Sequence, residues 1–266
     1  MRFGVSSACL YPEDTLAAFD TLQNLDIQYI EVFVNTFSEL RKGYLSNLKE
    51  HMQRANTCIT SLHPFTCELE TFLFATDYNT RFKDGVQIYK KYFSMCKFLN
   101  IHQMAFHGMS LQSPFPFKEH CEYYAKLRKI AGDYGVDLCY ENVVRCKCGK
   151  AENIVKLREY TNDEASFLLD IKQMRRADVA TEKMLSAMNG KIKYVHLSDY
   201  SNDNDCIVPF KGSYNFNTLF AGLKAQNFDG DIILELYRNG FETAEDLKDA
   251  VYNIKQAYEK EEGTTI

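Results

Sequence analysis

The chain has 266 residues, of which 45% are hydrophobic and 25% are charged, a balance that is ordinary for a folded globular protein. Its formal net charge of -5 argues against binding to nucleic acid, because nucleic-acid-binding proteins usually present a basic face. No apolar run approaches the roughly 20 residues that span a bilayer, and residues 1–7 are too few and too polar for a signal peptide. We therefore expect a cytoplasmic protein without a membrane partner.

Short apolar runs alternate with longer amphipathic stretches along the whole chain, which is typical of parallel strands joined by helices. The predicted strands cover residues 3–7, 29–34, 58–63, 103–107, 136–142, 166–170, 192–197 and 231–236. One predicted helix opens at Pro12, and the others cover residues 38–56, 80–99, 117–134, 150–160, 179–188, 217–226 and 243–258. Ser38 is the expected cap of the second helix.

Eight strand-and-helix units in a chain close to the ~250 residues of a typical (β/α)8 barrel favour that fold. An open doubly wound sheet is the competing interpretation, but it usually carries a glycine-rich phosphate turn after the first strand. The corresponding residues here, 6–9, are Ser-Ser-Ala-Cys and contain no glycine. We predict an α/β fold, a single (β/α)8 TIM-barrel domain over residues 1–266, with a flexible tail at about 259–266.

Four of the apolar runs end in a side chain that can bind a metal ion. They end at Glu141, Asp170, His196 and Glu235, with steps of 29, 26 and 39 residues between them. Steps of this size correspond to about one strand-and-helix unit, so we expect all four side chains at the C-terminal mouth of the barrel. For a single acidic residue, a solvated loop is the simpler explanation. Four in succession, each in an apolar run where an unpaired charge is costly, favour a shared site.

Two glutamates, one aspartate and one histidine suit a hard divalent cation. Mn²⁺ is the first expectation, with Mg²⁺, Co²⁺ or Zn²⁺ as alternatives. Such a quartet would hold one ion and leave two coordination positions open, which suits two adjacent oxygens of a sugar or a hydroxyketone.

The nine cysteines follow no framework spacing, and reduced thiols in a cytosolic protein are the simplest interpretation. Cys146 and Cys148 form a close pair, but a CxC motif alone is a weak zinc signal. We expect structural or surface thiols there.

Four short motifs stand at these strand ends in a fixed order: Tyr140-Glu141-Asn142, Leu169-Asp170, Val195-His196-Leu197-Ser198-Asp199 and Leu234-Glu235. In them the chain resembles the xylose isomerase-like TIM barrels, which include sugar-phosphate isomerases and epimerases, ketose 3-epimerases, inosose dehydratase and endonuclease IV. The resemblance extends from the first strand to the final helix. It implies that Glu141, Asp170, His196 and Glu235 bind one divalent ion, and that Glu141 and Glu235 also transfer the substrate proton.

The resemblance also nominates substrate contacts around the mouth. His63 and His107 close the third and fourth strands, where epimerase-like relatives place substrate-contacting groups and endonuclease IV-like relatives place ligands for extra zinc ions. Many relatives carry a histidine three residues after the aspartate, but Gln173 occupies that position here. Glutamine can hydrogen-bond a hydroxyl but binds zinc poorly, which counts against a trinuclear zinc nuclease.

Three cationic side chains are further candidates for substrate contact: Lys172, Lys211 and Arg238. Lys211 lies in the loop after the seventh strand, where epimerases carry a substrate-binding arginine, and a solvated loop lysine is the alternative. Lys172 is either an anion-binding or catalytic lysine in the mouth or a surface residue. Glu31, inside the second strand, is a candidate for a buried acid behind the site.

We therefore expect a divalent-metal-dependent isomerase or epimerase of a small sugar, sugar phosphate or polyol that abstracts a proton beside a metal-bound carbonyl. A dehydratase of an inosose-like ketone would begin with the same step and is the first alternative. An endonuclease IV-like abasic-site nuclease and a barrel that binds a ligand without turnover are the others. The resemblance leaves a homodimer or a homotetramer open.

Overall fold

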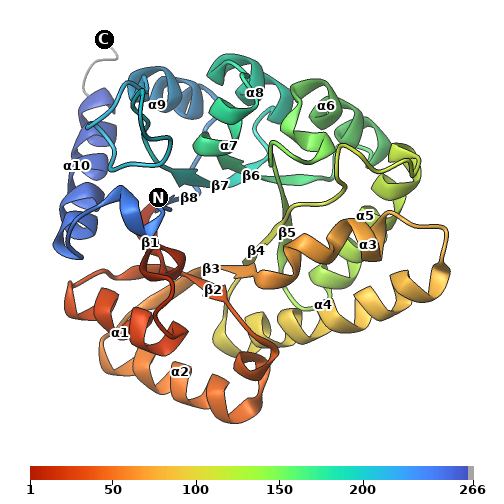
Figure 1. Ribbon diagram of the computed structural model, residues 1–266, viewed down its shortest axis with the longest axis horizontal. Coiled ribbons are helices and arrows are strands. Elements are labelled where there is room, and N and C mark those ends of the chain that lie inside the picture. Colours follow the sequence, from red (N-terminus) through yellow and green to blue (C-terminus); the bar gives the residue numbers. More distant parts are fainter. Residues whose placement is uncertain (263–266) are drawn as a thin grey trace.

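Eight parallel strands close into a barrel in chain order, with β1 paired to both β2 and β8. The computed structural model describes residues 1–262, with side chains through Lys260 (Figure 1). The strands are β1 Arg2–Ser6, β2 Tyr29–Val34, β3 Cys58–Pro64, β4 Gln103–Phe106, β5 Asp137–Glu141, β6 Ser166–Asp170, β7 Ile192–Leu197 and β8 Asp231–Leu234. This closed parallel barrel confirms the predicted fold class.

Helices surround the barrel and lie between successive strands (Figure 1). They are α1 Thr15–Asn24, α2 Lys42–Arg54, α3 Glu70–Phe74, α4 Asn79–Leu99, α5 Phe117–Gly132, α6 Ala151–Tyr160, α7 Ile171–Arg176, α8 Thr181–Met188, α9 Phe216–Ala225 and α10 Glu245–Glu262. Short 3-10 segments precede several of them, at Ser7–Leu10, Phe37–Leu40, Phe65–Leu69, Lys147–Gly149 and Arg238–Gly240.

The predicted helix over residues 38–56 is wrong at its start. Thr36, rather than Ser38, caps a 3-10 turn there, and Arg41 is extended, so α2 begins only at Lys42. The reason is Glu39, which is buried and accepts hydrogen bonds from the Thr15 hydroxyl and the Asn35 backbone amide. Burying this carboxylate draws the first turn towards the barrel and separates it from the helix that follows.

Two short helices were not predicted, and both lie at the mouth. The helix α7 begins directly after β6 because the side chain of Asp170 accepts a hydrogen bond from the Gln173 amide and caps it. The helix α3 is only five residues long, too short for a helical period to be visible in the sequence. At the other end of the chain, α10 continues as a helix to Glu262, where the sequence predicted a tail from residue 259; residues 263–266 lie outside the described residues.

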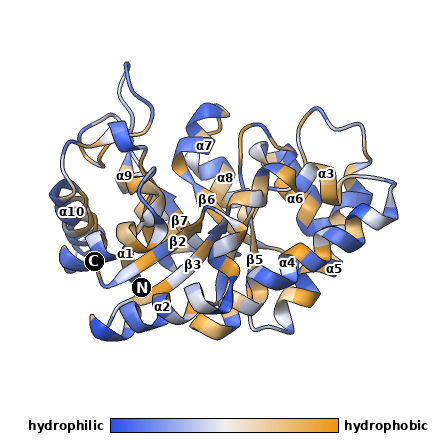
Figure 2. Cartoon of the chain, turned by 60° about the horizontal axis from the view of Figure 1, so that its bottom comes forward, coloured by the Kyte–Doolittle hydropathy of each residue, from blue (hydrophilic) through white to orange (hydrophobic). Residues whose placement is uncertain are grey.

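Hydrophobic side chains from strands and helices form one continuous core, and a smaller cluster fills the barrel interior. Figure 2 shows hydrophobic colour along β2 and β7, and hydrophilic colour on the outer helix α2 and on the short helix α7 at the mouth. The N-terminal end of the barrel is closed by an ion pair in which Arg2 Nε lies 2.6 Å from Asp231 Oδ1. Within the described residues, no helix has the length and apolar character needed to cross a membrane.

Candidate metal centre

The barrel brings the four predicted ligands together at its C-terminal mouth. Glu141 and Asp170 are the last residues of β5 and β6, His196 lies in β7 opposite Asp170, and Glu235 follows β8 directly. Ligand atoms of Glu141, Asp170 and His196 lie within 4.8 Å of one another, and those of Glu31, His196 and Glu235 do so too. The two groups share His196, so the four predicted ligands and Glu31 form one cluster.

Three atoms of the predicted quartet are buried without a hydrogen-bond partner, namely Glu141 Oε2, Asp170 Oδ2 and His196 Nδ1, and Glu31 Oε1 is a fourth such atom in the cluster. His196 Nδ1 lies 4.0 Å from Asp170 Oδ2 and 3.5 Å from Glu235 Oε2. A buried polar atom without a partner is costly, and several that converge are the mark of a group bound between them. The donor set of carboxylates and one imidazole therefore fits a divalent cation.

Asn142 fixes the position of Asp170. Its side-chain amide donates to the Asp170 carbonyl at 2.9 Å, and its side-chain oxygen accepts from the Asp170 amide at 2.7 Å. The pair extends the contact between β5 and β6 beyond the last backbone pairing, Glu141 with Leu168. Because Asp170 Oδ1 is occupied by the Gln173 amide, only Oδ2 faces the site.

Glu31 holds His196 from inside the barrel. Its Oε2 atom lies 3.0 Å from His196 Nε2 and accepts a hydrogen bond from the Ser61 hydroxyl at 2.9 Å. A histidine that donates through one ring nitrogen to a carboxylate presents the other nitrogen in a fixed direction. This is the role that the sequence suggested for Glu31, and the contact leaves Nδ1 facing Glu235.

His63 and His107 lie against Glu141. The Nε2 atom of His107 is 2.9 Å from Glu141 Oε2, although the two atoms are not aligned as a hydrogen bond, and Nε2 of His63 is 3.7 Å away. The two Nε2 atoms are 3.2 Å apart, and the His63 ring stacks on Phe33. Both histidines therefore line the same side of the cluster as the carboxylate of Glu141.

The turn after His107 is braced by side chains that the sequence did not single out. Gly108 has φ +77°, and a Cβ atom there would lie 1.7 Å from the Tyr140 hydroxyl, so only glycine fits. The Gly108 amide donates to the buried carboxylate of Glu70, which also accepts from the Tyr89 hydroxyl. The one signal for Glu70 is an acidic residue in the apolar stretch Leu69–Phe74, and periodicity does not reveal it.

Lys172 reaches into the cluster from α7 and is almost completely buried. Its ammonium donates to Glu235 Oε2 at 2.8 Å and lies 3.5 Å from Asp170 Oδ2. The same ammonium lies 4.8 Å from the centre of the Tyr237 ring. Lys172 is thus in the mouth and in contact with two of the predicted metal ligands.

The pKa values around the cluster reflect an excess of negative charge. Burial raises the pKa of Asp170 to about 6, although Lys172 opposes the rise. Burial alone would lower the pKa of His196, but Glu31 and Glu235 raise it to about 10. Burial would also raise the pKa of Glu141, yet His107 and His63 hold it well below its ordinary value. The carboxylates around His196 thus favour a positive charge beside them, as a divalent cation would supply.

The other predicted substrate contacts have structural partners. The Gln173 side-chain oxygen accepts from the Val144 amide at 3.2 Å and so holds the loop after β5. Lys211 is exposed in the loop after β7, 3.9 Å from Asp246, and the exposed Arg238 lies over Phe241. Neither contacts the quartet in the described residues, and their roles in substrate binding stay predictions. Cys146 and Cys148 are both buried free thiols.

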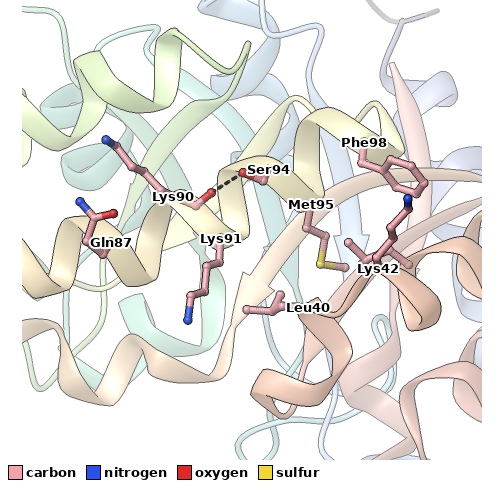
Figure 3. Close-up of a pocket in the computed structure, with 9 residues that line it drawn as sticks. Leu40, Lys42, Gln87, Lys90, Lys91, Ser94, Met95 and Phe98 are labelled. Carbon is pink, nitrogen blue, oxygen red and sulfur yellow. Dashed lines mark hydrogen bonds between the residues drawn. The ribbon is translucent and has the colours of Figure 1, made fainter.

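A separate hollow of about 480 Å³ lies on the outer side of the barrel between α2 and α4. Figure 3 shows Lys90 and Lys91 extending from α4 beside Met95, with the Ser94 hydroxyl bonded to the Lys90 carbonyl at 2.7 Å. Its lining has lysines and apolar side chains but no carboxylate and no histidine. The predicted metal ligands lie in the barrel mouth, and none of them lines this hollow.

Comparison with protein families shows where this arrangement belongs. The model of the xylose isomerase-like TIM barrel family matches residues 19–257. The chain belongs to this family. The resemblance inferred from the strand-end motifs is thereby confirmed. A comparison with curated protein sequences found no match.

Solved structures of similar barrels match this chain over almost its whole length. A D-tagatose 3-epimerase-like protein is 19% identical, with 98% of this chain and 97% of that chain covered and a TM-score of 0.80. A D-allulose 3-epimerase from Methylomonas sp., in complex with D-allulose, is 16% identical, with 97% of each chain covered and a TM-score of 0.79. The IolI protein with a bound zinc atom is 19% identical, with 97% and 98% covered and a TM-score of 0.79. At these identities the likeness is one of fold.

Proposed function

We propose that this protein is a divalent-metal-dependent isomerase or epimerase of a small sugar, sugar phosphate or polyol. The observation that carries the proposal is the convergence of Glu141 Oε2, Asp170 Oδ2 and His196 Nδ1 as buried atoms without hydrogen-bond partners. Similar barrels include ketose 3-epimerases and one protein solved with zinc, which supports this reaction class and a bound metal ion.

Glu141, Asp170, His196 and Glu235 would hold one divalent ion, with Mn²⁺ as the first candidate. When bound, the ion would polarise a substrate carbonyl and acidify the neighbouring C–H bond. Asp170 and His196 serve as anchors, because Asn142 holds the Asp170 backbone and Glu31 holds the His196 ring. Glu141 and Glu235 come from strands three positions apart in the barrel, so they approach a bound substrate from different sides.

Glu141 is the candidate for removing the proton. His107 and His63 keep its pKa well below the ordinary value despite burial, so the carboxylate is ionised, which is the form that a general base requires. Glu235, protonated from solvent, delivers a proton to the other face or to the adjacent carbon, and solvent takes up the proton left on Glu141, so that both carboxyl groups return to their starting states. The two exchange roles in the reverse reaction. Positioned general acid–base groups of this kind contribute roughly 10²–10⁴-fold to the rate.

His63 and His107 are positioned to contact substrate hydroxyls as well as Glu141. Their Nδ1 atoms are buried and have no hydrogen-bond partner, although Nε2 of each lies close to Glu141. His107 and Glu235 retain more exposure than the other cluster residues, with 11% and 12% of their side chains accessible. Since these two stand on opposite sides of the mouth, we place the substrate entrance between them.

A dehydratase of an inosose-like ketone would use the same proton abstraction. The two reactions are separated by a substrate panel in which purified protein, freed of metal and then loaded with Mn²⁺, is incubated with ketopentoses, ketohexoses and an inosose. We expect interconversion of two ketoses, detected by chromatography, and loss of that activity after chelation. Loss of water from the inosose alone would support the dehydratase. Cleavage of abasic DNA without any action on sugars would contradict the proposal.

A further inference from the structure

Lys172 is the one permanent cation in contact with the metal-binding cluster among the described residues, and the atoms it contacts define its role. Its Nζ atom lies 2.8 Å from Glu235 Oε2 and 3.5 Å from Asp170 Oδ2. These are the same oxygens that face His196 Nδ1, at 3.5 Å and 4.0 Å. The ammonium therefore approaches the ligand atoms from within the cluster.

A residue that merely supports a metal ligand binds the ligand's outer atom. The outer oxygen of Asp170, Oδ1, is already taken by the Gln173 amide, and the outer nitrogen of His196 is taken by Glu31. Lys172 instead reaches the inner oxygen of Asp170, which has no other partner. An ion held by Asp170 and Glu235 would have to share these oxygens with the ammonium or displace it.

We propose that Lys172 is an internal cation that occupies part of the metal centre and lowers its affinity for the divalent ion. The inference rests on the proposed metal centre and adds a side chain that determines how tightly this centre binds its ion. The ammonium neutralises Asp170 and Glu235 while no ion is bound, and it moves aside when the ion enters. The face of Tyr237, whose centre lies 4.8 Å from Nζ, offers the displaced ammonium a second partner.

The exposed side of Tyr237 is fixed in turn by α7. Arg176 donates to the Tyr237 hydroxyl at 3.0 Å, and Arg176 Nε is itself paired with Asp205 at 2.6 Å. The aromatic ring is therefore held beside Lys172 whether or not the ammonium leaves Glu235. A short movement of the Lys172 side chain towards Tyr237 is therefore sufficient for the ion to replace the ammonium beside Glu235.

The test is the affinity of metal-stripped protein for Mn²⁺, measured by calorimetry, in Lys172→Met and in two controls. Lys172→Arg keeps the positive charge, and Lys183→Met removes an exposed lysine from α8. Removing a fixed charge about 3 to 4 Å from the ligand oxygens should tighten binding by about tenfold or more, even at an effective dielectric constant near 20. We expect the tighter affinity in Lys172→Met alone, and a lower Tm for that variant when it is stripped of metal.

The opposite sign would overturn the proposal, because removal of a residue that supports a ligand from outside weakens metal binding by roughly 10–100-fold. Unchanged affinity would also overturn it while leaving the metal centre intact. If neither the wild type nor Lys172→Met binds Mn²⁺, the metal centre itself fails together with this inference. Should stripped Lys172→Met not fold, release of Mn²⁺ from the loaded variant into a chelator decides: slower release than wild type supports the proposal, and equal or faster release contradicts it.

Discussion

Glu31 and His196 are joined by a hydrogen bond of 3.0 Å inside the barrel, and neither side chain has meaningful contact with solvent. The bond uses His196 Nε2, so Nδ1 is the ring nitrogen that faces Asp170 and Glu235. A buried carboxylate on β2 thus determines which atom of a β7 histidine faces the proposed metal centre.

Replacing Glu31 with glutamine is therefore expected to weaken Mn²⁺ binding by roughly 10–100-fold, because the ring loses its charged partner and its fixed orientation. Calorimetric titration of metal-stripped protein measures this directly. Glu39→Gln is the matched control, since Glu39 is also a buried carboxylate but contacts Thr15 and Asn35 instead of the cluster. Equal Mn²⁺ affinity in Glu31→Gln and wild type would show that this contact does not orient a ligand.

The number of ions per chain separates the proposed reaction from nuclease chemistry. We expect one divalent ion per chain by elemental analysis after dialysis, and none in a variant that combines Asp170→Asn with His196→Asn. His63 and His107 both lie near Glu141, so a second ion could be imagined beside the first. Two or three zinc ions per wild-type chain would therefore contradict the assignment of these histidines to substrate contact.

The position of the strand-end quartet could be predicted because each proposed ligand follows an apolar run whose end is visible in the sequence. Glu141 and Asp170 close their strands as expected, and the order of strands around the barrel follows the order in the chain. The alternation of apolar runs and amphipathic stretches is sufficient to locate the strands and their ends, because this pattern is a matter of local periodicity alone.

The partners of the ligands could not be predicted in the same way. Contacts such as Lys172 with Glu235 and Gly108 with Glu70 join residues far apart in the chain, and they depend on side-chain directions at the mouth. Lys172 projects inward because Asp170 starts the short helix α7, which the sequence did not reveal. Lys211 and Arg238, chosen for charge and position alone, are exposed and contact Asp246 and Phe241.

His120 should make the protein sensitive to acid independently of the metal centre. Its Nδ1 donates to the Phe74 carbonyl at 2.8 Å, and its Nε2 is 3.0 Å from the Tyr140 hydroxyl, which also accepts from the Met109 amide. This pattern requires neutral imidazole, and burial lowers the pKa of His120 to about 4. The native state therefore binds fewer protons than the unfolded chain between pH 6.5 and 4.

The stability that neutral His120 provides is fully present above pH 6.5 and is lost as the pH falls towards 4, on the order of 3 kcal/mol in total. Urea unfolding at a series of pH values should show a smaller loss in His120→Gln than in wild type over this interval. His102→Gln, which alters an exposed histidine, should lose free energy of unfolding with falling pH as the wild type does. Parallel slopes for all three proteins would contradict this assignment of the buried imidazole.

The exchange of substrate hydrogen with solvent tests the central claim, that Glu141 and Glu235 move a proton on a metal-bound sugar. Ketoses turned over in the substrate panel are incubated in D₂O with Mn²⁺-loaded protein, and deuterium at the carbon beside the carbonyl is followed by NMR after removal of Mn²⁺. We predict incorporation with the wild type and a loss of roughly 10²–10⁴-fold in Glu141→Gln, with the fold retained and both proteins measured at saturating Mn²⁺. Deuterium incorporation at the wild-type rate in Glu141→Gln would contradict the account.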